Sequence, residues 1–390
     1  MSNTRRFITI FSTLAIIVAT SGQAMAGNGK GKKDKQACSQ TAKTLYQACH
    51  FDTKDDLLET NANCINVIGK DARAECLDEA AAAWKEDRKT CKDQRNARLD
   101  VCDQVGEGRY KNPLMNPDIA FIDPDEIGTT YAPNHYVSLT EGHTYVLRAG
   151  EDFEETVIVH VTDEIREAEG YDEPVLCRVV VDAAMIAEED EEDGGTEWVP
   201  EEVTDDYFAQ DDASIVYYCG EISRNFEDGY LDNLDGSFFS GVDFAKAGVL
   251  MRQYPAVGQV DRQEYAIAEA EDVIEYMDLT AIPSLEEGGQ NPNDPSFACS
   301  GITDGDCLMT RDSAALDPES TEYKYYLKDV GFVLAVAMED GEITGEREEL
   351  VCVGDSLDVL SSDACGLDDV EELLEELCEL SPDAFCPDDD

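Results

Sequence analysis

Six cysteines near the N-terminus are spaced as a palindrome, and this spacing constrains the fold more than any other feature. They are Cys38, Cys49, Cys64, Cys76, Cys91 and Cys102, separated by 11, 15, 12, 15 and 11 residues. The pairs Cys38/Cys102, Cys49/Cys91 and Cys64/Cys76 therefore share one centre, Lys70. Separations of 11 and 15 residues are close to whole numbers of helical turns, so the cysteines of each arm share one face. The spacing predicts an antiparallel helical hairpin with three nested disulfides.

The composition of the two arms supports the hairpin. They contain no proline, few glycines and many Ala, Lys, Glu, Gln and Arg, while Gly69-Lys70-Asp71 supplies the break between them. Six cysteines allow many pairings, and the common centre favours the nested one. A metal site or a redox pair is the alternative, but both usually require a C-x-x-C pair, which these arms lack.

The first 26 residues have the pattern of a secretory signal peptide. Arg5 and Arg6 precede an apolar stretch at 7–20, and Ala24-Met25-Ala26 forms a small-residue cleavage pattern. We therefore expect cleavage near Ala26 and a secreted or periplasmic protein. No cysteine follows closely enough for a lipid anchor, and no later stretch is long and apolar enough for membrane insertion. All 14 cysteines follow the predicted cleavage site, as expected for a protein with disulfides.

Charge divides the chain at residue 111. Residues 27–111 contain 16 Lys+Arg and 15 Asp+Glu, whereas residues 112–390 contain 11 and 72, a net charge of −61. A surface this acidic repels nucleic acid and anionic lipid, and it attracts cations. Solubility in a saline habitat is the simpler explanation of this acidity, and a specific cation store is the alternative.

The acidic part is predicted to be β-rich. We divide it into a linker (112–133), a β-rich domain (134–353) and a Cys-containing tail (354–390). Runs rich in Val, Ile, Tyr and Thr, bounded by turn residues, lie at 143–149, 155–163, 174–186, 205–211, 214–223, 262–268, 270–279, 307–312, 322–329, 331–339 and 347–353. They predict an antiparallel half-barrel or sandwich, and the apolar stripe in 367–380 predicts a short C-terminal helix. The fold class is therefore α+β.

The remaining cysteines are predicted less completely. Cys177 and Cys219 lie in two strand-like runs and are expected to bridge them, and Cys299 and Cys307 are expected to close one loop. The spacing leaves open how the last four pair; these are Cys352, Cys365, Cys378 and Cys386.

Several sequence blocks resemble an uncharacterised family of secreted bacterial proteins. These include "DDYFAQDDASIVYYCGEISRNFEDG", "GVDFAKAGVLM" and "YKYYLKDVGFVLAV", which follow a Cys-rich segment in the same order. The resemblance covers most of the chain to about residue 350, although Tyr207 and Tyr217 stand where that family often has Trp. It implies export and a Cys-rich helical hairpin followed by a β-domain, and it implies no activity.

Two weak candidate sites follow from the residues themselves. Asp228, Asp232, Asn233 and Asp235 surround two glycines and could supply oxygen ligands to Ca²⁺ as a cofactor, although a solvated hairpin turn is the simpler explanation. Tyr207 and Tyr218 could line a ligand site, or they could belong to the core.

The leading hypothesis is a secreted, non-enzymatic binding or surface-associated protein. In it the hairpin is a spacer or docking arm toward an unknown surface or protein partner, and the acidic β-domain is the recognition module. Two alternatives remain open: a periplasmic carrier of a small apolar ligand, and an exported hydrolase that uses carboxylates.

Overall fold

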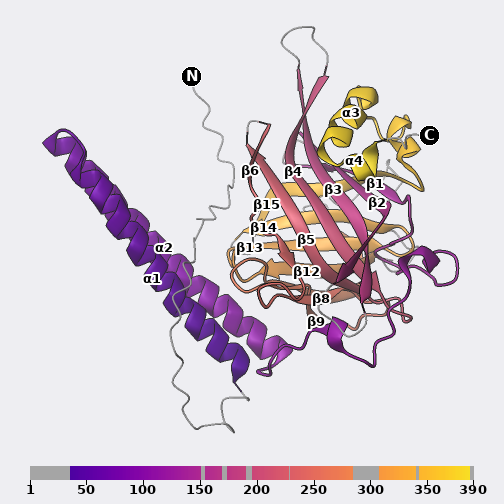
Figure 1. The fold of residues 1–390 in the computed structure, drawn as a ribbon, viewed down its shortest axis with the longest axis horizontal. Coiled ribbons are helices and arrows are strands. Elements are labelled where there is room, and N and C mark those ends of the chain that lie inside the picture. The colour runs from indigo at the N-terminus through magenta and orange to yellow at the C-terminus, as the bar shows by residue number, and fades with distance from the viewer. Residues whose placement is uncertain are drawn as a thin grey trace.

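A computed structural model describes residues 36–150, 154–168, 174–189, 196–227, 229–283, 307–339 and 342–386. It shows two N-terminal helices, a large antiparallel sheet that is nearly closed into a barrel, and a short C-terminal helix (Figure 1). The predicted fold class is therefore confirmed. The predicted signal peptide lies outside the described residues.

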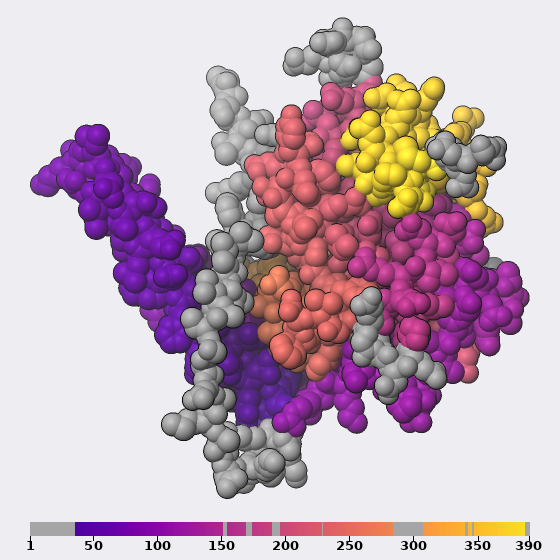
Figure 2. Space-filling model, in the orientation of Figure 1, coloured from indigo at the N-terminus to yellow at the C-terminus, as the bar shows by residue number. Residues whose placement is uncertain are grey.

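The two helices form the predicted hairpin, with α1 at Ala37–Ile65 and α2 at Lys70–Val105. Three disulfides join them: Cys38–Cys102, Cys49–Cys91 and Cys64–Cys76. Few side chains other than these cysteines are buried along the two helices. The disulfides thus supply the stability that a two-helix unit cannot obtain from an apolar core. Figure 2 shows the outer part of this hairpin standing clear of the barrel.

The barrel wall is a sheet of 15 strands. The strands are β1 (Thr144–Ala149), β2 (Glu155–Ala168), β3 (Val175–Glu189), β4 (Thr196–Gln210), β5 (Val216–Glu227), β6 (Tyr230–Asn233), β7 (Phe238–Phe239), β8 (Lys246–Met251), β9 (Val260–Arg262), β10 (Glu264–Tyr265), β11 (Asp272–Ala281), β12 (Cys307–Ala314), β13 (Ser320–Leu327), β14 (Gly331–Glu339) and β15 (Glu342–Gly354). Their order is β10-β8-β5-β4-β3-β2-β1-β15-β14-β13-β12-β11-β9, and β6 and β7 pair with β5. The sheet ends β9 and β10 follow each other in the chain, which brings the two edges together.

One end of the barrel is filled by apolar side chains. The segment 112–142, which contains the short helices η2 (Pro113–Met115) and η3 (Pro124–Glu126), contributes buried Ile122, Ile127 and Leu139. They pack in one cluster with side chains of β2–β5 and β11–β13. The predicted linker is therefore packed against the barrel.

The C-terminal segment covers the outside of the barrel. It comprises η4 (Leu357–Ser361), α3 (Val370–Leu380) and α4 (Pro382–Phe385), and α3 and α4 pack near β4 and β2 (Figure 1). Disulfides link Cys177–Cys219, Cys352–Cys365 and Cys378–Cys386. Cys307 is also disulfide-bonded, while its predicted partner Cys299 lies outside the described residues. No described helix is long and apolar enough to cross a membrane.

Candidate functional site

The two faces of the barrel wall differ in chemistry because side chains alternate along each strand. On β4, Val203 and Tyr207 point outward into an apolar cluster that includes Leu373 and Leu377 of α3. The alternate residues of β4 point inward, and among these is Asp206, opposite Glu221 of β5.

Ten carboxylates share the inner face, and we call them the interior carboxylates. They are Glu155, Asp182, Glu202, Asp206, Glu221, Glu264, Asp272, Asp312, Glu322 and Glu348. They come from nine strands, so only the closed sheet brings them together. No local sequence pattern distinguishes these ten residues from the other acidic residues of the chain. The alternation in "EEVTDDYF" (201–208) could have indicated an acidic inner face, but only once the closure was known.

Contacts across the barrel show that these groups form one electrostatic unit. Four strands separate Asp182 on β3 from Lys324 on β13 along the sheet, yet the Lys324 charge acts on the Asp182 carboxylate. Glu264, on the edge strand β10, is likewise influenced by Asp272 and Asp206. The side chain of Glu322 is 43% exposed, so water reaches the interior.

Eight of the interior carboxylates hold protons more tightly than ordinary carboxylic acids. They are Glu155, Asp182, Asp206, Glu221, Glu264, Asp272, Asp312 and Glu348. Burial, followed by the charges of neighbouring carboxylates, raises the pKa of Glu348 to about 8 and that of Glu155 to about 7. Burial likewise raises the pKa of Glu221 to about 7 and that of Asp272 to about 6. A cation that enters the barrel would therefore displace protons from these groups.

Lys324 is the cation within this group. Its ammonium Nζ lies 3.2 Å from Glu322 Oε2 and 3.6 Å from Asp312 Oδ2. Glu322 and Asp312 raise its pKa further above the ordinary lysine value, although burial opposes them. The interior therefore already accommodates one alkylammonium group.

The two tyrosines predicted to line a ligand site lie on opposite faces of the sheet. Tyr207 faces outward, where its hydroxyl accepts a hydrogen bond from Arg166 Nη1 (2.8 Å). Tyr218 faces inward, and its hydroxyl contacts both Asp206 and Glu221, the latter at 2.8 Å. Only Tyr218 therefore belongs to the interior, where burial and these carboxylates raise its pKa.

The candidate calcium loop follows the turn between β5 and β6. Asp228 lies outside the described residues. Asn233 Oδ1 accepts hydrogen bonds from Asn225 Nδ2 (3.1 Å) and from the Asp235 amide (2.9 Å), and Asp232 accepts one from Asn233 Nδ2. Among the residues described, no three His, Cys, Asp or Glu side chains are grouped to hold a metal ion. Calcium binding at this loop therefore stays a prediction.

Comparisons with known proteins assign no family. No family model matches the chain, and no curated protein matches it. Two solved structures match. One, described as a lipoprotein from Parabacteroides distasonis, is 10% identical with a TM-score of 0.25, and it covers 57% of this chain and 100% of its own. The other, described as an exported protein with a YmcC-like fold from Bacteroides fragilis, is 11% identical with a TM-score of 0.24 and the same coverage. At these TM-scores the likeness supports no functional argument, and the family resemblance stays a prediction.

Proposed function

We propose that this protein is an exported, non-enzymatic binding protein whose β-domain takes up an organic cation inside the barrel. The observation that carries the proposal is the set of ten interior carboxylates, which surround a single lysine. Export is supported by the disulfides, which persist in oxidising compartments, and by the predicted signal peptide.

The arrangement of the carboxylates favours an extended ligand over a single metal ion. Calcium requires six to eight oxygen ligands gathered around one point, and within the described ranges no such group of acidic side chains occurs. The interior carboxylates are instead distributed over nine strands. A linear polyamine, or a peptide segment rich in lysine, could place several ammonium groups along such a surface, as Lys324 already does with one.

The hairpin is proposed as a docking arm. It is nearly neutral, with 16 basic and 15 acidic residues in 27–111, and the disulfides hold it straight as it projects from the acidic body (Figure 2). Its tip exposes Ile65 and Ile68, which are 65% and 95% exposed. These apolar side chains would contact the unknown surface or protein partner.

Isothermal titration calorimetry tests the cation proposal. We expect spermine, a linear polyamine, to bind the full chain more tightly than Ca²⁺ does, and more weakly as salt screens the charges. Glu348→Gln and Asp206→Asn should each weaken spermine binding by about tenfold, the value of one charge-assisted contact. The matched control is Glu349→Gln, because Glu349 follows Glu348 on β15 and points outward toward Arg347. Equal spermine affinity in all three variants would refute an interior site.

The carrier hypothesis fits this interior poorly, because ten carboxylates lie on the inner face and the apolar side chains at one end of the barrel are already packed against the segment 112–142. The hydrolase hypothesis keeps one supporting observation, which is the contact of the Tyr218 hydroxyl with both Asp206 and Glu221, two carboxyl groups with raised pKa values. Hydrolysis of a chromogenic glycoside that is abolished in both Asp206→Asn and Glu221→Gln would favour the hydrolase.

A further inference from the structure

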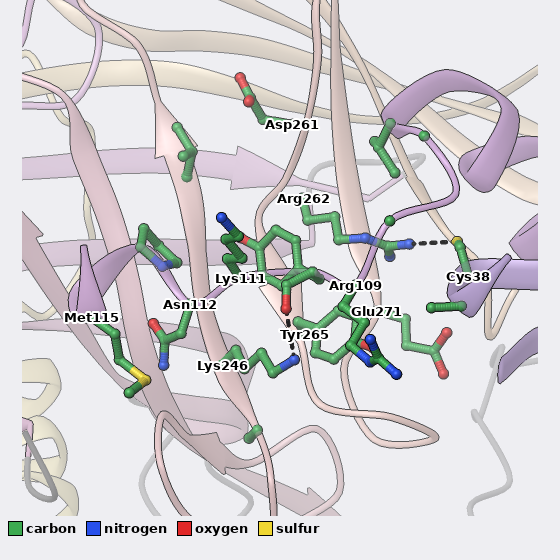
Figure 3. A pocket seen from close by; sticks show the side chains of 18 of the residues that line it. Cys38, Arg109, Lys111, Asn112, Met115, Lys246, Asp261, Arg262, Tyr265 and Glu271 are labelled. Carbon is green, nitrogen blue, oxygen red and sulfur yellow. Dashed lines mark hydrogen bonds between the residues drawn. The ribbon is translucent and has the colours of Figure 1, made fainter. Parts of the chain in front are cut away.

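A large cavity lies between the base of the hairpin and the seam where the barrel closes. Its volume is about 1520 Å³, and its walls come from the ends of α1 and α2, the segment 104–119, and β8–β10 (Figure 3). Tyr265 follows Glu264 on β10, so it points away from the interior carboxylates. The cavity is therefore a separate site from the barrel interior.

The charge of the cavity is opposite to that of the protein. Its lining contains six basic residues, Arg98, Arg109, Lys111, Lys246, Arg252 and Arg262. It contains only three acidic residues, Asp118, Asp261 and Glu271. The whole chain, by comparison, contains 29 basic and 87 acidic residues. A basic surface in so acidic a chain is not explained by general solubility.

Two of the arginines already have carboxylate partners. Arg98 donates from Nε and Nη2 to both oxygens of Glu271, at 2.7 and 2.8 Å, and this pair is almost fully buried. Arg252 makes the same two-point contact with Asp261, at 2.5 and 2.7 Å. These pairs account for two of the three acidic residues, and the Arg98 pair attaches the hairpin to the barrel.

Arg262 has no such partner. No described carboxylate forms an ion pair with it, its buried Nε has no hydrogen-bond partner, and its Nη2 reaches only the Cys38 sulfur at 3.6 Å (Figure 3). The guanidinium lies over the ring of Tyr265, 5.3 Å from the centroid. Burial lowers the pKa of this arginine. An unsatisfied guanidinium in a cavity is an unused anion-binding group.

Lys246 lies beside Arg262 and also forms no ion pair within the described part of the chain. Its Nζ donates to the Tyr110 carbonyl at 2.8 Å and lies 4.7 Å from the ring centroid of Tyr265. Tyr110 and Tyr265 stack on each other at 4.9 Å. Burial and the neighbouring Arg262 charge lower the pKa of Lys246. The two stacked rings thus hold two like charges at one wall of the cavity.

We propose that this cavity binds an organic oxyanion, with Arg262 and Lys246 as the anchors for its carboxylate or phosphate group. The cavity exceeds the usual range of about 300 to 1,000 Å³ for small-molecule pockets, and Met115, Ile119 and Val249 add apolar wall. The ligand therefore has an aromatic or aliphatic body as well as an acidic group. This inference is independent of the cation proposed for the barrel interior.

Calorimetry of the full chain with benzoate and with phenyl phosphate tests this site. We expect at least one of them to bind with a 1:1 stoichiometry, and we expect Arg262→Gln and Lys246→Gln each to weaken binding by about tenfold or more. The matched control is Arg166→Gln. Arg166 also stacks on aromatic rings, at 4.6 Å from Tyr207 and 4.8 Å from Phe239, but lies outside the cavity.

The outcomes separate the two sources of the oxyanion. Saturable binding of phenyl phosphate alone assigns a phosphate ligand, and binding of benzoate alone assigns a carboxylate. The absence of saturable heat with both probes at about 10 mM would overturn the proposal. Equal affinity in Arg262→Gln and Arg166→Gln would also overturn it. Lys246→Gln keeps the test decisive if Arg262→Gln fails to fold, because Lys246 is less enclosed than Arg262 and forms no contact with the hairpin disulfide.

Discussion

Replacing Glu348 by glutamine removes one ionisable carboxyl group from the barrel interior and leaves the side-chain shape nearly unchanged. Glu348 lies on β15, where burial and the charge of Asp182 raise its pKa from 4.5 to about 8, against the opposing effect of Lys324. The folded protein therefore resists ionising this group, whereas the unfolded chain does not. We expect Glu348→Gln to stabilise the ligand-free protein at alkaline pH.

The magnitude follows from the difference in pKa. A rise from 4.5 to about 8 corresponds to roughly 5 kcal/mol if each pKa unit is worth about 1.4 kcal/mol. Water reaches the interior and neighbouring carboxylates can take up protons instead, so we expect about 2 kcal/mol. For a chain of this length that is a rise in Tm of about 2 to 3 °C.

The pH dependence gives the sign of the effect of Glu348→Gln on stability. A carboxylic acid with a raised pKa stabilises the folded state below its unfolded pKa of 4.5, and this contribution is lost as the pH rises through about 8. Thermal melts of wild type and Glu348→Gln should therefore nearly coincide at about pH 4 and separate toward about pH 8.

The control for this experiment is Glu349→Gln, which removes an outward ion pair to Arg347 at 3.0 Å. Glu349→Gln should lower the free energy of unfolding by less than about 1 kcal/mol. The reasoning is refuted if Glu348→Gln melts at or below wild type at about pH 8, or if its advantage is the same at every pH.

Three further predictions concern the hairpin, the seam where the barrel closes, and the attachment of the hairpin to the barrel. Replacing Cys64 and Cys76 together by serine should destabilise the tip of the hairpin by about 3 kcal/mol, seen as faster hydrogen exchange there, with an unchanged melt of the barrel. Gly248→Ala should lower Tm or prevent folding, since a Cβ at Gly248 would lie 2.1 Å from the Gln263 carbonyl oxygen; a melt equal to that of wild type would contradict this contact. Arg98→Met should cost about 3 kcal/mol or more by stranding Glu271, and adding Glu271→Leu should recover part of that loss in chemical denaturation.

The hairpin could be predicted because its information is local. The cysteine spacing indicates helical periodicity directly, and the shared centre at Lys70 favours the nested pairing without any knowledge of the barrel. The Cys177–Cys219 disulfide could be predicted for a similar reason, since both cysteines lie in clear strand-like runs. The last four cysteines pair as Cys352–Cys365, which joins β15 to the tail, and Cys378–Cys386, and their spacing alone does not distinguish these pairs from other pairings.

The first half of β4 and the strand β8 could not be predicted from the sequence, for physical reasons. The first half of β4 contains Pro200 and several acidic residues, which are unusual in a strand. Pro200 is tolerated because it lies where the register of the pairing with β3 shifts, opposite Met185. The short strand β8 is defined by its partners on β5 and β10 more than by its own composition.

The interior carboxylates could not be found from local patterns. Which face of each strand turns inward depends on register and closure, and a shift of one residue would move every carboxylate to the outside. The cavity at the hairpin base depends in the same way on how α2 meets β9 and β10. Both sites arise from tertiary structure, so the sequence indicated an acidic domain without locating its charges.

The most direct test of the cation proposal is the number of protons released when spermine binds. Calorimetry at about pH 7 in two buffers with different ionisation enthalpies measures that number. The account predicts release, because Glu155, Glu221 and Glu348 have pKa values of about 7 to 8 and must ionise to pair with an ammonium group. Binding without proton release would place the polyamine on the outer acidic surface and contradict a site inside the barrel.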